Sequence, residues 1–313
     1  MKKPLVVLSG ATASGKSETA VLLAKRISGE IVSADSMQVY IGMDIGSAKI
    51  TENEMDGIKH HLLDVLEPSQ AFSAAVFKEM ALKAMGEIFD RGNIPIITGG
   101  TGFYIHALLY DSEFGEISSE INDSDGYESV SRDKLWETLK AVDPISADAI
   151  HPNNVKRVKR AIDYYNLTGR PFSEHNKKER EKASPYDFKY FVLYDDRKAM
   201  YARIDERVDK MIDAGLVGEV RALYAKGCTP EMVSMQGIGY KELIPYIDGD
   251  WTLEQSVDLI KKNTRHYAKR QLTWFRREKD AIWINIKEFE YNKEKIVDHL
   301  VEVINNTEAT EKA

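Results

Sequence analysis

One octapeptide constrains this chain more than any other feature of its sequence: Gly10-Ala11-Thr12-Ala13-Ser14-Gly15-Lys16-Ser17. The apolar run at residues 4–9 directly precedes it and has the length and β-branched content of one buried strand. After it, apolar residues recur at helical spacing over residues 19–27. A strand, a glycine-containing loop and a helix in this order predict a phosphate-binding loop, or P-loop.

The chemistry of a P-loop explains this spacing. Gly10 and Gly15 allow backbone N–H groups to close around a diphosphate, at which the positive end of the new helix also points. Lys16 adds a point charge, and the Ser17 hydroxyl is a ligand suited to Mg²⁺. Taken alone, the loop predicts nucleotide binding, with ATP as the expected ligand; a glycine turn without a ligand is the alternative.

The other apolar runs define the fold class. Strand-like runs at residues 30–34, 94–98, 188–194 and 281–286 alternate with helical patterns at 72–91, 201–211 and 293–304. They predict an α/β fold: a P-loop NTPase-like parallel sheet core flanked by helices. Residues 117–184 show helical patterns only, so we expect an inserted all-helical domain there and a core domain made of residues 1–116 and 185–313. An acidic, serine-rich segment at 111–132 leads into the insertion.

The composition limits where in the cell this protein can act and which partners it can bind. No apolar stretch approaches the roughly 18 to 20 residues that span a bilayer, and the only cysteine, Cys228, permits no internal disulfide and no Cys-x-x-Cys metal site. We therefore expect a cytoplasmic protein with no membrane partner, in which Cys228 packs at a loop edge. The net charge of −7 argues against nucleic acid as a partner, but phosphate contacts depend on a local basic face.

Two polar residues follow predicted strands at the edge where the P-loop also lies. Asp35 ends the second strand, and it has three interpretations: a magnesium ligand, a general base or the cap of the next turn. Thr101 lies in the cluster Gly99-Gly100-Thr101-Gly102-Phe103-Tyr104, where glycines allow close approach of a ligand; a glycine turn without a ligand is the alternative. The adjacent pair His60-His61 has no third ligand at metal spacing, so we expect hydrogen-bonding roles.

Basic residues gather in three places. Arg203 and Arg207 lie on one face of a predicted helix, where they could clamp a diphosphate or could pair with Asp205, Glu206 or Asp209. A second basic stripe, on the helix after Pro152, is formed by Lys156, Arg157, Lys159 and Arg160. The stretch 261–277 has seven Lys or Arg, interleaved aromatic residues and no acidic residue, which suits a nucleic-acid backbone. A solvated helix face is the alternative for the second stripe.

Several of these stretches together resemble the bacterial tRNA dimethylallyltransferases. The resemblance runs in unbroken order over roughly residues 4–286. It is carried by the P-loop, residues 35–40, residues 99–104, residues 151–157, Gly237-Ile238-Gly239-Tyr240 and residues 265–275.

The resemblance implies transfer of a dimethylallyl group from dimethylallyl diphosphate to the exocyclic N6 amine of the adenine 3′ of the anticodon, with release of diphosphate. Asp35 would be the general base, and Thr101 would lie at the substrate channel. Lys16 and the loop amides would hold the diphosphate, with Mg²⁺ at Ser17 and Arg203 or Arg207 as the clamp.

The resemblance also implies where the anticodon loop of tRNA binds, and we expect a monomer. The residues that would contact tRNA are Asp35, Ser36, Met37, Gln38, Lys156, Arg157, Lys159, Arg160, Gly237, Gly239, Tyr240, Lys269, Arg270, Gln271, Thr273, Trp274 and Arg276.

The sequence departs from the family pattern at four places. Ala11 replaces a proline, Phe103 stands where leucine is usual, and Ile41 stands where a basic residue is frequent. An arginine that usually precedes Asp143 by about twenty residues is absent, and the residues there are 120–123, Glu-Ile-Asn-Asp.

Two other functions compete. A P-loop small-molecule kinase would use Arg203 and Arg207 as a lid, but it would leave residues 261–277 unexplained. A nucleotide-switched RNA-binding module would carry out no transfer chemistry.

Overall fold

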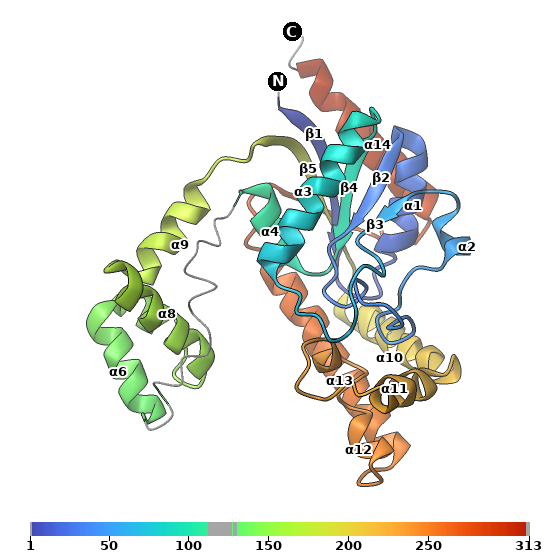
Figure 1. Ribbon diagram of the computed structural model, residues 1–313. Coiled ribbons are helices and arrows are strands. Elements are labelled where there is room, and N and C mark those ends of the chain that lie inside the picture. Colours follow the sequence, from blue (N-terminus) through green and yellow to red (C-terminus); the bar gives the residue numbers. More distant parts are fainter. Residues whose placement is uncertain (1, 112–126, 128–129, 311–313) are drawn as a thin grey trace. The chain divides into compact units, whose positions relative to one another are not determined.

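The structure is a computed structural model that describes residues 2–111, 127 and 130–310 (Figure 1). The chain divides into two compact units, Met1–Leu108 with Tyr186–Ala313, and Leu109–Pro185. The second unit begins eight residues before the helical insertion expected at 117–184 and ends one residue after it. Position 117 itself and most of the acidic segment at 111–132 lie outside the described residues.

The first unit is built on a parallel sheet with the strand order β3-β2-β4-β1-β5-β6. Its strands are β1 (Lys3–Gly10), β2 (Gly29–Ser33), β3 (His60–His61), β4 (Ile94–Gly99), β5 (Tyr186–Tyr194) and β6 (Ala281–Asn285). The carboxyl ends of β1, β2 and β4 are neighbours in this order, so the residues that follow them meet at one edge. The predicted α/β class with a parallel, helix-flanked sheet is confirmed.

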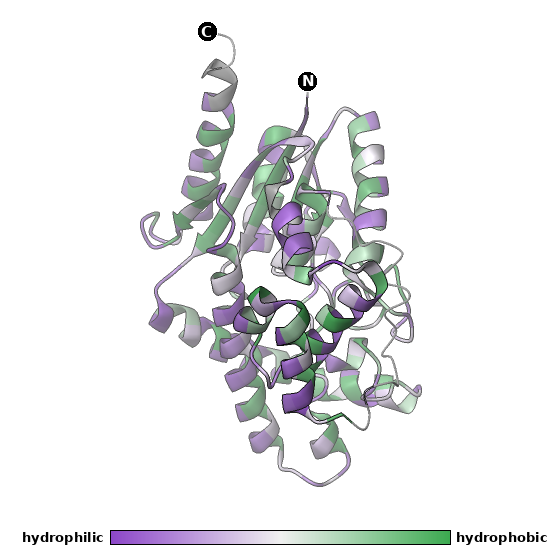
Figure 2. Cartoon of the chain, turned by 90° about the vertical axis from the view of Figure 1, so that its left-hand side faces the viewer, coloured by the Kyte–Doolittle hydropathy of each residue, from purple (hydrophilic) through white to green (hydrophobic). Residues whose placement is uncertain are grey.

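Helices cover both faces of this sheet. Side chains alternate along a strand, so Phe191 faces α1 (Lys16–Ile27) and α14 (Lys293–Thr310), with which it shares an apolar core. Tyr190, which precedes Phe191, points to the opposite face of the sheet. There its ring contacts that of Phe275, with 6.4 Å between the ring centroids. The helix α3 (Ala74–Asp90) crosses β2 and β4. Figure 2 shows the strands mainly green and the helices banded purple and green, as expected for amphipathic helices around an apolar sheet.

Further helices of the first unit gather beyond the end of the sheet where the P-loop lies (Figure 1). They are α10 (Arg197–Asp213), α11 (Leu216–Ala225), α12 (Ile244–Ile247) and α13 (Leu253–Phe275). A small apolar cluster joins Met200 and Ile204 of α10 to Ala268 of α13 and to Ala11 of the P-loop. Both helices therefore pack directly against the loop. The short elements are α2 (Glu52–Met55), α4 (Gly102–Leu109) and a 3₁₀ turn, η2 (Ser234–Gln236).

The described residues of the second unit form helices only. These are α6 (Arg132–Val142), α7 (Pro144–Ala149), α8 (Val155–Thr168) and α9 (Phe172–Glu181). Leu139, Val158 and Ala161 are central to their shared apolar core. The buried Asp143 carboxylate caps α7 by accepting from the N–H of Ser146 at 3.0 Å, and it also accepts from the N–H and hydroxyl of Ser173 at 2.8 and 2.7 Å.

In the described parts of both units, no helix combines the length and the apolar character needed to cross a membrane.

Candidate functional site

The P-loop has the backbone geometry of an anion cradle. Gly15 precedes α1 at φ 82°, and Ala13 has φ 62°, so both lie in the left-handed region. Gly10 lies against the neighbouring strand β5, because a Cβ there would be 2.7 Å from the carbonyl oxygen of Leu193. Lys16 begins α1, so the N–H groups of the first helical turn have no intrahelical partner. They form a donor set to which the helix dipole adds positive potential.

A solvent-open pocket adjoins the loop. It is lined by Lys16, Ser17, Ile31, Ser33, Asp35, Gln38, Ile50, His60, Leu63, Thr98 and Gly99. The lining combines a cation, a carboxylate and hydroxyl groups with apolar side chains such as Ile50 and Leu63. Such a surface suits a ligand with an anionic end and a short apolar end.

The electrostatics of Lys16 depend on the groups around it. Burial lowers its pKa to about 8, and the nearby positive charge of Arg207 acts in the same direction, whereas Asp35 acts against both. Lys16 is therefore mainly protonated at pH 7. A bound anion would favour the protonated form, so binding and protonation of Lys16 are coupled.

Arg203 is fixed against the P-loop. Its Nε donates to the carbonyl oxygen of Ala13 at 3.1 Å, and its Nη1 donates to the buried carboxylate of Asp195 at 2.6 Å. Its Nη2 is buried and has no hydrogen-bond partner in the part of the chain that the structure describes. The guanidinium thus holds the P-loop through Nε, and its Nη2 remains able to donate a hydrogen bond to a ligand in the loop.

Arg207 lies one turn further along α10, in the field of the same site. Burial lowers its pKa, while the carboxylates of Asp35 and Glu54 raise it. The alternative of surface pairing for Arg203 and Arg207 is wrong, because the three acidic residues that it names pair with other cations. Those pairs are Asp205 with Arg265 at 2.5 Å, Glu206 with Lys210 at 2.7 Å and Asp209 with Lys261 at 2.6 Å.

Asp35 follows β2 and faces this positive region. Its Oδ1 accepts from the N–H of Met37 at 2.8 Å and from the N–H of Gln38 at 3.3 Å, so it caps the next turn. Its charge also acts on Lys16 and Arg207. The cap and a chemical role are therefore compatible, since one carboxylate oxygen makes both capping bonds.

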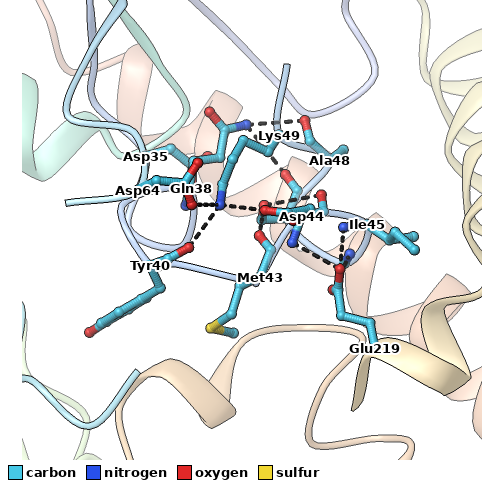
Figure 3. A network of polar contacts seen from close by, with 12 residues as sticks. Asp35, Gln38, Tyr40, Met43, Asp44, Ile45, Ala48, Lys49, Asp64 and Glu219 are labelled. Atoms are coloured by element: carbon cyan, nitrogen blue, oxygen red, sulfur yellow. Dashed lines mark hydrogen bonds and ion pairs between the residues drawn. The ribbon is translucent and has the colours of Figure 1, made fainter. Parts of the chain in front are cut away.

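A polar network holds the loop that follows Asp35 (Figure 3). The Gln38 amide Nε2 donates to the carbonyl oxygens of Ser47 at 3.3 Å and Ala48 at 3.2 Å. The Gln38 amide thus helps to hold this loop, and its contact to tRNA stays a prediction. From α11, Glu219 accepts from the backbone N–H groups of residues 44–46 at 2.7–3.0 Å. Nearby, Lys49 donates to the Tyr40 carbonyl oxygen at 2.8 Å.

Gln271 connects the P-loop to the glycine cluster. Its Oε1 accepts from the N–H of Thr12 at 2.9 Å, and its Nε2 donates to the carbonyl oxygen of Gly100 at 3.0 Å. The residue is only 5% exposed, and its amide fastens two parts of the site to each other; its contact to tRNA stays a prediction. The next residue of the cluster, Thr101, has a buried hydroxyl and donates its N–H to the Ala34 carbonyl oxygen at 3.3 Å.

Tyr240 packs inside the protein, and its contact to tRNA stays a prediction. Its ring is fully buried against Gly46, and its hydroxyl donates to Glu219 Oε1 at 2.8 Å. Gly239, at φ 99°, donates its N–H to Glu242 Oε2 at 2.8 Å. Gly237 lies against Met37, since a Cβ there would be 2.7 Å from its sulfur. This segment supports the loop after Asp35.

The side chains of the predicted basic faces differ in their exposure to solvent. On α8, Lys156, Arg157 and Arg160 are exposed, whereas Lys159 is half-buried with its Nζ 5.6 Å from the ring centre of Tyr127. On α13 and at its C-cap, the exposed residues of the predicted set are Lys269, Arg270, Thr273 and Arg276; Trp274 is half-buried. At the other end of the site, Ser36 and Met37 are half-buried.

The histidine pair and the cysteine take the roles expected of them. His60 Nδ1 lies 2.9 Å from the carbonyl oxygen of Ile58, and His61 Nε2 lies 2.8 Å from Glu30 Oε2. Among the described residues, no three His, Cys, Asp or Glu side chains come together as a metal site. Cys228 is buried, and burial raises the pKa of its thiol.

Two residues of the site escaped the sequence analysis. Asp195 follows β5 as Asp35 follows β2, so the rule that ligands gather at strand ends could have found it. Tyr267, on α13, is half-buried next to Thr101 and Gln271, and burial and the charge of Asp35 raise the pKa of its hydroxyl. Its aromatic, basic surroundings in the sequence gave no sign of an inward position.

Comparison with known proteins places these features in a family. The family model for IPP transferase matches residues 38–278. A tRNA dimethylallyltransferase from Lachnoclostridium phytofermentans is 50% identical over 311 residues, covering 98% of this chain and 99% of that protein. One from Halalkalibacterium halodurans is 44% identical over 297 residues, covering 94% of each.

Solved structures agree with the sequence relatives. A tRNA delta(2)-isopentenylpyrophosphate transferase from Staphylococcus epidermidis is 42% identical, with a TM-score of 0.73 over 97% of this chain and all of that one. A eukaryotic dimethylallyltransferase acting on tRNA is 28% identical, with a TM-score of 0.82 over 97% of this chain and 80% of that one. With a family model that covers most of its length and relatives of up to 50% identity among those compared, the chain belongs to the IPP transferase family.

Proposed function

We propose that this chain transfers a dimethylallyl group from dimethylallyl diphosphate to the N6 amine of the adenine 3′ of the anticodon in tRNA and releases diphosphate. Relatives at 44–50% identity over nearly their whole length are named tRNA dimethylallyltransferase. The observation that carries the proposal is the pocket in which Lys16 and Asp35 meet the apolar side chains of Ile50 and Leu63. A diphosphate with a five-carbon tail matches this mixture of charge and apolar surface.

The cationic end of the site suits departure of a diphosphate. The allylic C–O bond breaks through a charge-separated transition state, so positive charge fixed in advance on the departing oxygens lowers the barrier most. Lys16, Arg207 and the N–H groups at the start of α1 supply that charge in our assignment. Arg203 fixes the loop through Ala13, and its Nη2, which has no hydrogen-bond partner among the residues described, can donate to the diphosphate.

We assign Asp35 as the general base. As the adenine N6 forms its bond to the allylic carbon, it must lose a proton. The Oδ1 of Asp35 is held by two backbone N–H groups, which orients the carboxylate, and we assign the proton to Oδ2. A positioned base of this kind contributes about 10²- to 10⁴-fold. The adenine reaches such a site most easily from a single-stranded loop, where it is not paired.

The residues also fit Mg²⁺. This ion prefers oxygen ligands and keeps several waters while it binds one or two protein groups together with phosphate oxygens. Ser17 and Asp35 both line the pocket beside the P-loop, which gives one hydroxyl and one carboxylate. We propose that Ser17 holds the ion, which when bound would neutralise part of the charge on the leaving diphosphate.

The tRNA would lie along two basic surfaces. We assign phosphate contacts to the exposed residues Lys156, Arg157 and Arg160 on α8, to Lys269 on α13 and to Arg276 at the C-cap of α13. The contacts tether the anticodon loop while one base enters the site. We place this reaction in the cytoplasm and infer that a monomer carries it out.

A labelling experiment tests the function. The protein is incubated with anticodon stem-loop RNA and either labelled dimethylallyl diphosphate or labelled ATP, and the RNA is digested to nucleosides. We expect label from dimethylallyl diphosphate in one modified adenosine and none from ATP. Label transferred from ATP to a small molecule, with unmodified RNA, would support a kinase instead.

A further inference from the structure

We propose that Tyr291 is a positioning residue for the diphosphate site: its ring covers the guanidinium of Arg203 and holds it beside the P-loop. This inference rests on the proposed function, in which Arg203 donates to the departing diphosphate. Tyr291 follows β6 and lies beyond residues 38–278, which the family model matches. No role has yet been given to it.

The ring of Tyr291 lies over the charged group of Arg203. The guanidinium carbon is 5.6 Å from the ring centroid, which is within the distance of a cation–π contact. The same guanidinium donates to the carbonyl oxygen of Ala13 in the P-loop and to the carboxylate of Asp195 after β5. Arg203 therefore contacts three parts of the chain, and Tyr291 provides the contact from the turn after β6.

The turn that presents Tyr291 is held by hydrogen bonds and adjoins the P-loop. The N–H of Ile286 donates to the Tyr194 carbonyl oxygen at 3.0 Å, and the N–H of Tyr291 donates to the Ile286 carbonyl oxygen at 3.0 Å. Two residues after Tyr291, the Cε of Lys293 lies 3.6 Å from the position of a Cβ on Gly15. The ring is thus attached to a fixed segment that touches the phosphate-binding loop.

Backbone strain marks the same turn. Glu290 has φ 56° and Tyr291 has φ 60°, and in the part of the chain that the structure describes no other two neighbouring non-glycine residues both have positive φ. A bulky side chain rarely adopts this region, because its Cβ comes too close to the backbone, whereas glycine adopts it freely. Tyr291 is also 46% exposed, so its burial in the core is small. A strained, half-exposed tyrosine points to a role for the ring in its contact with Arg203.

A ring in this place strengthens diphosphate binding in two ways. It restricts the guanidinium, so less side-chain freedom is lost when the ligand binds. It also displaces water from the charged group, and a hydrogen bond is stronger where water is excluded. The Arg203 Nη2 is buried and has no hydrogen-bond partner among the described residues, so both effects act on a donor that is available to the ligand.

Binding of inorganic diphosphate tests the proposal without the transfer reaction. The Kd is measured by titration calorimetry in the presence of Mg²⁺ for the wild type, Tyr291→Phe and Tyr291→Ala. The energy of a cation–π contact corresponds to about 2- to 30-fold in Kd, so we expect a loss in that range for Tyr291→Ala and at most about twofold for Tyr291→Phe, which keeps a ring. The matched control is Tyr246→Ala. That ring also lies 5.6 Å from a guanidinium carbon, that of Arg221, but it belongs to α12, and we expect its loss to leave the Kd unchanged.

Two further comparisons separate positioning from a merely structural role. Tyr291→Gly relieves the strain at φ 60° that Tyr291→Ala keeps, so it should have the higher Tm of the two. Both variants lack the ring, so both should bind diphosphate equally weakly. In an Arg203→Met background, Tyr291→Ala should cause no further loss, because the ring acts through the guanidinium.

Three results would overturn the positioning role. They are a Kd of Tyr291→Ala equal to that of the wild type, a wild-type Kd in Tyr291→Gly, and losses at Tyr291 and Arg203 that multiply in full. Because the assay reads diphosphate binding alone, absent prenyl transfer by the wild type would refute the proposed function and leave this result intact.

Discussion

Replacing Gln271 tests whether α13 holds the site together or reads RNA. Its amide makes one bond to the Thr12 N–H at 2.9 Å and one to the Gly100 carbonyl oxygen at 3.0 Å, in a position that is 5% exposed. Gln271→Met keeps the volume but leaves both backbone groups without this partner. Each buried, unsatisfied group costs about 1–3 kcal/mol, and some relaxation of the loop is expected.

We therefore expect Gln271→Met to lower the free energy of unfolding by about 2–4 kcal/mol. For a unit of this size that corresponds to a decrease in Tm of about 4–16 °C. The KM for dimethylallyl diphosphate should rise because the P-loop is less well fixed, while stem-loop affinity should stay within about twofold. The measurements are thermal unfolding, initial rates and RNA anisotropy.

The control for this experiment lies on the same helix. Thr273 is exposed and its hydroxyl donates to the Lys269 carbonyl oxygen within α13, so Thr273→Ala should change stability by less than about 0.5 kcal/mol. A Gln271→Met protein with unchanged Tm and a strongly reduced affinity for RNA would refute the bridging role. It would favour Gln271 as an RNA contact.

Three further predictions follow from the same contacts. The pKa of Lys16 is about 8, and a bound anion favours its protonated form. The affinity for dimethylallyl diphosphate should therefore be flat below pH 8 and fall above it, by at most tenfold per pH unit. Lys16→Met should remove this pH dependence, which titration calorimetry measures. Reversing charge at Arg157 and Arg160 should reduce the slope of log K against log salt for tRNA by about 1.4–1.8, and an unchanged slope would remove α8 from the RNA surface. Tyr240→Phe loses the hydroxyl bonds to Glu219 and to the Ser47 backbone, so it should cost about 1–2 kcal/mol in denaturant unfolding with stem-loop affinity unchanged. A large loss of RNA binding at normal stability would contradict its buried role.

The sequence predicted the elements that depend on local pattern. The P-loop, the strands that precede Asp35 and Thr101, and the face shared by Arg203 and Arg207 all follow from spacing and from the direction of parallel strands. These features repeat with fixed periods, so a single chain reveals them.

The sequence could not predict which polar residues turn inward. On α13, Gln271 and Lys269 lie two positions apart in a stretch rich in cations, yet one is buried against the P-loop and the other is exposed. Tyr240 lies in a glycine-bracketed segment that resembles a surface loop, but its hydroxyl partner, Glu219, comes from α11. Such roles arise from contacts between residues far apart in the chain, and periodicity carries no information about them.

The turnover of Asp35→Asn tests the central claim most directly. The asparagine amide oxygen can still accept from the N–H groups of Met37 and Gln38, so the cap is kept while the proton acceptor and its negative charge are lost. With saturating dimethylallyl diphosphate and stem-loop RNA, we predict that the single-turnover rate of prenyl transfer falls about 10²- to 10⁴-fold, with Tm and RNA affinity unchanged. A rate equal to that of the wild type would contradict the account.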